Sequence, residues 1–115
     1  MKLFQAMVNQ IKEVFNHEFG IMDETGLIVA CSDEQLIGQN NPLVPKVLQL
    51  KELFVVINGI SFLKVFIKGK MEFIVYMNSD EENCQKYLAL VGINIANVRE
   101  YHDEKFDKNS FIKNI

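Results

Sequence analysis

The sequence predicts an α+β domain: a five-stranded antiparallel sheet with helices on one face and long helices at both ends of the chain. Apolar residues recur at helical spacing near both ends, whereas five short runs rich in Ile, Val, Leu and Phe occupy the middle. Turn signals separate these runs, with glycines at Gly26, Gly59 and Gly69. A chain of 115 residues, 49% hydrophobic and with only 6 Gly and 2 Pro, has the composition of one globular domain.

The first helix is indicated by Phe4, Val8, Ile11 and Phe15, whose spacings of four, three and four residues place them on one helical face. Further apolar residues widen this face beyond what packing on one sheet requires. We therefore expect part of it to contact another surface.

Two strands follow, at about 18–23 and 27–32, separated by the short loop Asp-Glu-Thr-Gly. The segment "SDEQLIG" then predicts one helical turn, with Ser32 or Asp33 as its N-cap. The segment "QNNPLVPKVLQLKE" predicts a loop that leads into a helix of about two turns, because its two prolines suit a first turn.

Three more strands are predicted in "LFVVI", "SFLKVFIK" and "EFIVYM". The dipeptide Asn58-Gly59 joins the first two and is a strong hairpin signal, and Lys-Gly-Lys joins the second to the third. In the middle strand Leu63 and Val65 point to one face, whereas Lys64 and Lys68 point to the other. We therefore expect one face of the sheet to contact solvent.

The last helix is predicted from about residue 80 to beyond 102, with Ser79 and Glu82 forming a capping box. Its apolar stripe recurs at steps of four and three residues and consists of Cys84, Leu88, Val91, Ile95, Val98 and His102. The central "LALVGINIANV" is apolar nearly all round, so this helix needs partners on two sides.

Composition excludes several classes of function. The chain has 12 Lys and Arg against 15 Asp and Glu, with Arg99 as the single arginine, so no basic surface for nucleic acid is expected in this segment. The N-terminus has no continuous apolar stretch of a signal peptide, and no window spans a bilayer, so we expect no membrane contact and a cytoplasmic location. Cys31 and Cys84 are then expected to be reduced, buried thiols.

Residue patterns for catalysis or metal binding are weak. His17 and His102 lack an i, i+4 partner of a metal-binding type, and the chain has no Cys-x-x-Cys pair and no glycine-rich phosphate loop. We therefore expect no catalytic residues, no metal and no cofactor. The alternative is a small cysteine-dependent enzyme that pairs Cys31 with a distant histidine.

Two stretches carry a resemblance to a known family. The segment "IMDETGLIVACSDEQLIG" resembles the opening hairpin of the sugar-diacid recognition domain, and "YHDEKFDKNSFIKNI" resembles the connector in bacterial regulators of the carbohydrate-diacid and purine-catabolism type. The order of the elements resembles that of a PAS-type sensor. The resemblance implies a PAS-like sensory and dimerisation domain at 1–102, and the start of a connector at 103–115. A helix-turn-helix part that binds DNA would lie beyond Ile115.

The resemblance also places a ligand. The loop after the second strand, "CSDEQLIGQNN", would form the lip of a pocket, with Cys31, Ser32, Asp33 and Asn41 as the expected binding residues for a small metabolite. The alternative is that Ser32 or Asp33 caps a helix and Asn41 makes a turn. Because Arg99 is the only arginine, a neutral or weakly anionic metabolite is favoured over a dicarboxylate.

We expect a homodimer formed through the first and last helices. The expected interface residues are Phe4, Val8, Ile11, Phe15, Leu88, Val91, Ile95 and Val98. The second hypothesis is a dimerisation module without a ligand, which would have a solid core in place of a pocket.

Overall fold

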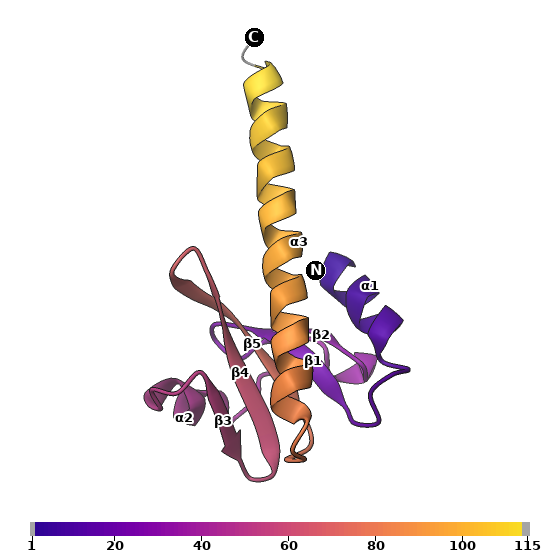
Figure 1. The fold of residues 1–115 in the computed structure, drawn as a ribbon, viewed down its shortest axis with the longest axis vertical. Coiled ribbons are helices and arrows are strands. Elements are labelled where there is room, and N and C mark those ends of the chain that lie inside the picture. Colours follow the sequence, from indigo (N-terminus) through magenta and orange to yellow (C-terminus); the bar gives the residue numbers. More distant parts are fainter. Residues whose placement is uncertain (1, 114–115) are drawn as a thin grey trace.

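The structure is a computed structural model that describes the backbone of residues 2–113 and the side chains of residues 2–100. It confirms an α+β fold with five antiparallel strands in the order β2-β1-β5-β4-β3 (Figure 1). The elements are α1 (Lys2–Ile11), β1 (Phe19–Asp23), β2 (Ile28–Cys31), η1 (Glu34–Leu36, a 3-10 turn), α2 (Val44–Gln49), β3 (Phe54–Ile57), β4 (Ile60–Ile67), β5 (Lys70–Met77) and α3 (Cys84–Lys113).

Helix α1 is shorter than its apolar stripe suggested. It ends at Ile11 in a turn, in which the Val14 amide donates to the Ile11 carbonyl over 3.0 Å. Phe15 therefore lies outside the helix, where its ring packs edge-on against Phe19 and stacks on Tyr87, with both pairs of ring centroids 4.9 Å apart. The last apolar residue of the stripe, Phe15, thus lies beyond the end of the helix and packs through aromatic contacts in the segment that follows.

The turns form where their residues predicted them. Asn58 and Gly59 both have positive φ, 54° and 76°, as a two-residue hairpin between β3 and β4 requires. The loop from β1 to β2 is closed by Asp23, whose Oδ1 accepts from the Thr25 amide at 2.8 Å and from the Leu27 amide at 3.1 Å.

The predicted start of the last helix is wrong by about four residues. Helix α3 begins at Cys84, and the Ser79 hydroxyl accepts from the Glu81 amide at 3.1 Å in a local turn, so the expected capping box with Glu82 is not formed. The Ser79 carbonyl is used elsewhere, since it accepts from the buried Ser61 hydroxyl at 2.7 Å. Residues 79–83 are thus held by β4 and form a connection instead of a first helical turn.

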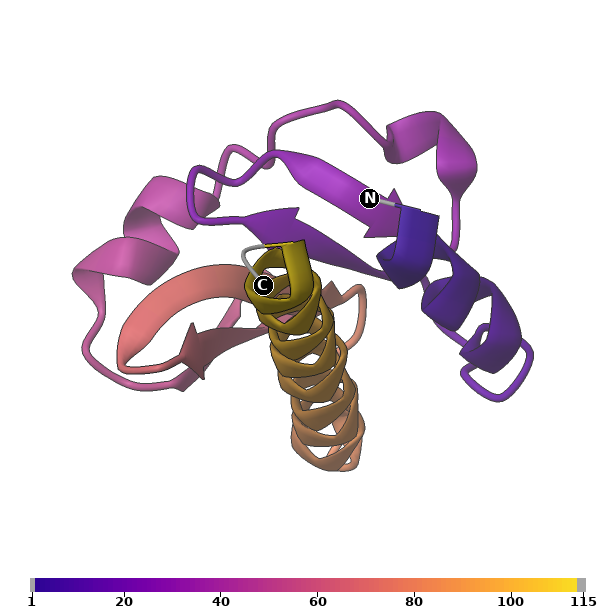
Figure 2. The same cartoon turned by 90° about the horizontal axis from the view of Figure 1, so that it is seen from above.

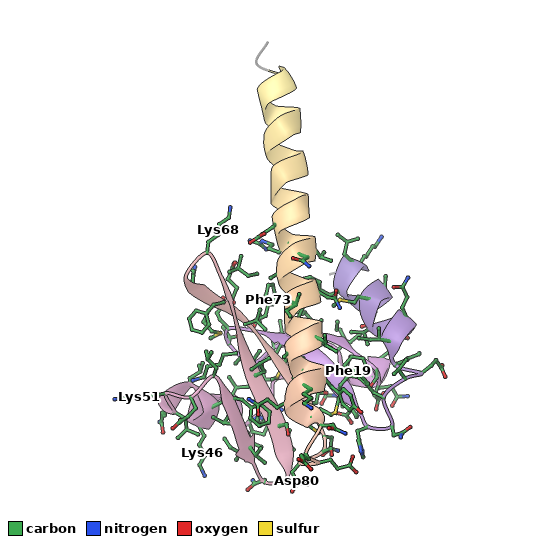
Figure 3. The ribbon with its side chains drawn as sticks, viewed as in Figure 1. Phe19, Lys46, Lys51, Lys68, Phe73 and Asp80 are labelled. Carbon is green, nitrogen blue, oxygen red and sulfur yellow. The ribbon has the colours of Figure 1, made fainter. Side chains whose placement is uncertain are left out.

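Both faces of the sheet are covered, which corrects the expectation of helices on one face only. Helices α1 and α3 cover one face, and α2 covers the other (Figure 2). We call the layer under α1 and α3 the helix layer. It contains Phe19 and Phe73, which lie beside α3 in Figure 3, and Phe4 packs edge-on against Phe73.

The layer under α2 is called the loop layer. Its ten buried residues are Met22, Ile28, Cys31, Val44, Val47, Val55, Ile57, Phe62, Ile74 and Tyr76. Lys64 lies on this face as predicted, but its ammonium donates to the Leu50 carbonyl at the end of α2. Solvent therefore reaches this face mainly at positions such as Phe66, which is exposed.

Helix α3 packs on the sheet with its first turns and then extends beyond it (Figure 1). Its backbone continues through the domain boundary predicted between residues 102 and 103. The side chains of the predicted connector at 103–115, like the stripe position His102, lie outside the described residues. Within the part of the chain that the structure describes, no helix is both long and apolar enough to cross a bilayer.

Candidate functional site

A row of three residues crosses the sheet in the loop layer. Gly20 on β1 stands between Cys31 on β2 and Tyr76 on β5, because the strand registers pair Gly20 with both of them. Cross-strand neighbours on one face lie side by side. The row therefore brings together two side chains that are 45 residues apart in the sequence.

Gly20 is required by the Tyr76 ring that lies over it. A Cβ atom at this position would stand 2.8 Å from the Tyr76 Cε1 atom and 2.7 Å from the Ala30 carbonyl oxygen. Both distances are shorter than carbon atoms tolerate. The missing side chain thus lets the tyrosine reach across β1 to the cysteine on β2.

Hydrogen bonds continue from this row to Glu18. The Tyr76 hydroxyl donates to Glu18 Oε2 over 2.7 Å, and its oxygen lies 3.1 Å from the Cys31 Sγ atom. Because the hydroxyl has one proton and uses it toward the carboxylate, we assign the thiol as donor to the tyrosine oxygen. The three residues form one directed chain, from Cys31 to Tyr76 to Glu18, which we call the polar chain.

Helix α1 fixes the cysteine end of the polar chain. The Gln5 side chain accepts from the Cys31 amide at 2.9 Å and donates to the Cys31 carbonyl at 2.9 Å. These two bonds satisfy backbone groups of the edge strand β2. The position of Cys31 is therefore set by a helix on the opposite face of the sheet.

Burial keeps the cysteine and the tyrosine neutral. Desolvation raises the pKa of the Cys31 thiol, and its hydrogen bond with Tyr76 only partly opposes this increase. Desolvation also raises the pKa of Tyr76, and its hydrogen bonds to Cys31 and Glu18 add to the effect. A nucleophilic cysteine needs a lowered pKa and access to solvent. Cys31 has neither feature, since its side chain is buried and its pKa is raised, and the cysteine-dependent enzyme considered above stays a hypothesis.

The other three predicted ligand residues make hydrogen bonds to backbone amides of the chain. The Ser32 hydroxyl accepts from the Phe19 amide at 3.1 Å, and Asp33 caps η1 by accepting from the Gln35 amide at 3.1 Å. Asn41 Oδ1 accepts from the Leu43 amide at 2.8 Å, just before α2. Asp33 and Asn41 thus have the capping and turn roles of the alternative interpretation, whereas Ser32 bonds to Phe19, 13 residues away. A binding role for the three residues stays a prediction.

The predicted dimer residues mostly belong to the core of one chain. The fully or almost fully buried ones are Phe4, Val8, Leu88, Val91 and Ile95, and the partly buried ones are Ile11, Phe15 and Val98; all pack in the helix layer. This corrects their assignment as a surface, because the sheet takes up the face that they form. Among the described side chains of α3, the most exposed apolar ones are Leu90 and Ile93, which lie elsewhere on the helix.

Strand β5 connects the polar chain to α3. Tyr76 points into the loop layer, and the next residue, Met77, points into the helix layer. The Cys84 thiol, at the first position of α3, lies 3.6 Å from the Met77 sulfur and 3.6 Å from the Ser79 carbonyl oxygen. Strand β5 therefore places Tyr76 of the polar chain next to Met77, which contacts the first residue of α3.

Sequence reasoning missed Glu18, Gly20, Tyr76 and Gln5. One signal for Gly20 was available, because a glycine inside a strand pattern indicates a close approach of another group. A tyrosine inside the apolar run of β5 likewise implies a partner for its hydroxyl. Neither signal identifies the partner.

The arrangement can transmit a change in packing or in hydrogen bonding from one face of the sheet to the other. Among the described side chains, no group of three or more His, Cys, Asp or Glu residues is placed to hold a metal ion.

A scan against protein-family models finds no matching family, and no curated protein and no solved structure matches the chain.

Proposed function

We propose that this chain is a ligand-sensing and dimerisation domain of a bacterial transcriptional regulator, with a PAS-like arrangement and a cytoplasmic location. The observation that supports it best is the coupling of the polar chain to α3 through adjacent residues of β5, Tyr76 and Met77. A sensor needs a group that responds on one side and an element that moves on the other. The DNA-binding helix-turn-helix is proposed to follow the sensing domain in the regulator, which fits the resemblance of residues 101–115 to a connector.

The signal is proposed to enter on the loop layer. The lip segment from Cys31 to Asn41 and the helix α2 border this face, and Cys31 is the lip residue that reaches the polar chain. A metabolite that hydrogen-bonds to Glu18 or displaces Tyr76 would move β5. Because α3 packs on the other face of β5, the helix would shift relative to the sheet.

The proposal is tested by a thermal-shift screen followed by hydrogen exchange. We expect neutral sugars or singly charged sugar acids to raise the Tm more than sugar diacids do, because the lip lacks a pair of cations. The ligand found should also change amide exchange in the first turns of α3, although it binds on the opposite face.

The matched control is Tyr76→Phe, which keeps the ring over Gly20 but removes the hydroxyl. This variant should lose the exchange response in α3. A response in α3 that is unchanged in Tyr76→Phe would contradict the role of the polar chain. A screen in which no compound raises the Tm would contradict sensing.

A ligand-free dimerisation module is the second candidate. It is favoured by the ten apolar and aromatic residues that fill the loop layer beneath α2. In that case the polar chain has a structural role, and Tyr76→Phe changes stability only.

A further inference from the structure

One face of α3 is exposed between residues 86 and 100, the last residue whose side chain the structure describes. At 3.6 residues per turn, the side of the helix opposite to the buried stripe carries a second set of residues, which also follow one another at steps of four and three. They are Lys86, Leu90, Ile93, Asn97 and Glu100, all of them exposed, and we call them the outer stripe. Leu90 is 59% exposed and Ile93 58%. Figure 1 looks onto this side of α3, which lies in front of the sheet with no other element covering it.

The outer stripe carries opposite charges at equal distances from its centre. Ile93 is at its centre, and Lys86 and Glu100 lie seven residues away in opposite directions, which is roughly 10 Å along the helix axis. Among the described side chains the ion pairs are His17 with Glu81 and Arg99 with Glu72, so neither end of the stripe forms an ion pair with another described side chain.

We propose that the outer stripe pairs with the outer stripe of a second copy of this chain, with the two α3 helices antiparallel and the two-fold axis at Ile93. Ile93 then packs on Ile93 of the second copy, and Leu90 faces the small side chain of Ala96. Each Lys86 meets a Glu100, so the interface contains the same ion pair twice. This inference rests on the dimerisation part of the proposed function and gives it a surface and an orientation.

The charges decide between the two orientations. In a parallel pair Lys86 would face Lys86 and Glu100 would face Glu100, and like charges across an interface oppose association. In the antiparallel pair both contacts are attractive. A second copy is favoured over a different protein because the pattern is complementary to itself.

Sedimentation equilibrium of the full chain tests the charges. The wild type should dimerise, and Lys86→Glu and Glu100→Lys should each raise the dissociation constant about tenfold. The double variant Lys86→Glu/Glu100→Lys should restore association, because the pairs are exchanged and kept. The control is Lys46→Glu, which makes the same change of charge on α2 (Figure 3), the helix that covers the other face of the sheet (Figure 2). No restoration in the double variant would overturn the proposal.

Disulfide trapping tests the orientation. Lys86→Cys/Glu100→Cys should form a disulfide-linked dimer under oxidation, whereas Lys86→Cys alone should not. Wild type is the control, since Cys31 and Cys84 are buried. A cross-linked dimer from Lys86→Cys alone would show a parallel pair and overturn the antiparallel one.

The variant Ile93→Asp separates this inference from the proposed function. It changes an exposed position, so the fold should persist, which circular dichroism verifies, and dimerisation should be lost. A folded Ile93→Asp variant that still dimerises would overturn the outer stripe but leave dimerisation intact. A wild type that remains monomeric at several hundred micromolar would overturn both.

Discussion

Gly20→Ala should destabilise the protein, although replacing glycine by alanine within a strand ordinarily stabilises it. The new Cβ would meet the Ala30 carbonyl oxygen at 2.7 Å and Tyr76 Cε1 at 2.8 Å. Relief requires that β2 moves away from β1 or that the tyrosine ring tilts. The ring resists, because its hydroxyl is held by Glu18 over 2.7 Å, and β2 is held at Cys31 by helix α1.

The expected magnitude follows from two opposing terms. Overpacking of this kind costs about 1–3 kcal/mol. The lower entropy of the unfolded alanine chain offsets about 0.4–1 kcal/mol of that cost. We therefore expect a net loss of about 1–2 kcal/mol in the free energy of unfolding, or a decrease of roughly 4–8 °C in Tm.

Urea denaturation measures this change, and Gly92→Ala is the matched control. At Gly92, in the middle of α3, a Cβ would lie 3.4 Å from Val65 Cγ2 and 3.6 Å from Leu63 Cδ2, which are ordinary contacts. Alanine should stabilise that position by about 0.5–1 kcal/mol through helix propensity. The same substitution should thus have opposite signs at the two sites. A Gly20→Ala variant as stable as wild type, with an unchanged m value, would refute the role assigned to Gly20.

Three further outcomes are expected. Because the pKa values of Cys31 and Tyr76 are raised in the fold, their contributions to the free energy of unfolding should be fully present below the unfolded pKa values of about 8.5 and 10. Above its own unfolded pKa, each group should lower the free energy of unfolding by about 1.4 kcal/mol per pH unit. Urea titrations between pH 7 and 11 measure this loss of stability. Tyr76→Phe should make the loss shallower above pH 10, and an unchanged slope of stability against pH would contradict the raised pKa of Tyr76. Burial opposes ionisation of Asp23, but hydrogen bonds, the first from the Thr25 side chain, outweigh it and lower the pKa of this carboxyl group. Asp23 should therefore contribute stability above about pH 4 that is lost as the pH falls below it, and Asp23→Asn should reduce this acid dependence and cost about 1 kcal/mol at pH 7, measured by thermal unfolding. Leu88→Ala, at a fully buried position of α3, should cost about 3 kcal/mol in urea denaturation, and a loss below 1 kcal/mol would place this helix face outside the core.

Local signals in the sequence predicted the elements well. Asn58 and Gly59 were identified as a hairpin turn because this pair tolerates positive φ, and the structure has it there. The spacing of Leu88, Val91 and Ile95 correctly indicated one apolar face of α3, although the structure buries this face against the sheet of the same chain and not in the expected dimer contact. In each case the deciding interaction lies within a few residues of the pattern.

Features that depend on distant residues were missed. The capping box at Ser79 is a good local motif, but the contact of its carbonyl with Ser61, 18 residues away, competes with it. The covering of both sheet faces also depends on distant residues, those of α1, α2 and α3, although the unbroken apolar run of β5 is typical of strands buried on both sides. The polar chain joins Glu18 to Tyr76 across 58 residues, and no pattern in one sequence specifies such a pair.

The strand order has a consequence for how the chain folds. The hairpin of β1 and β2 and the meander of β3, β4 and β5 each form from residues close together in the sequence, and β1 pairs with β5 to join them. In that pairing Phe19 lies opposite Met77, so a long loop must close before the contacts between the two units compensate for its lost entropy. Contacts of such high sequence separation slow folding. The junction of β1 with β5, which also contains Gly20 and Tyr76, is therefore expected to form in the rate-limiting step, after both local units have begun to form.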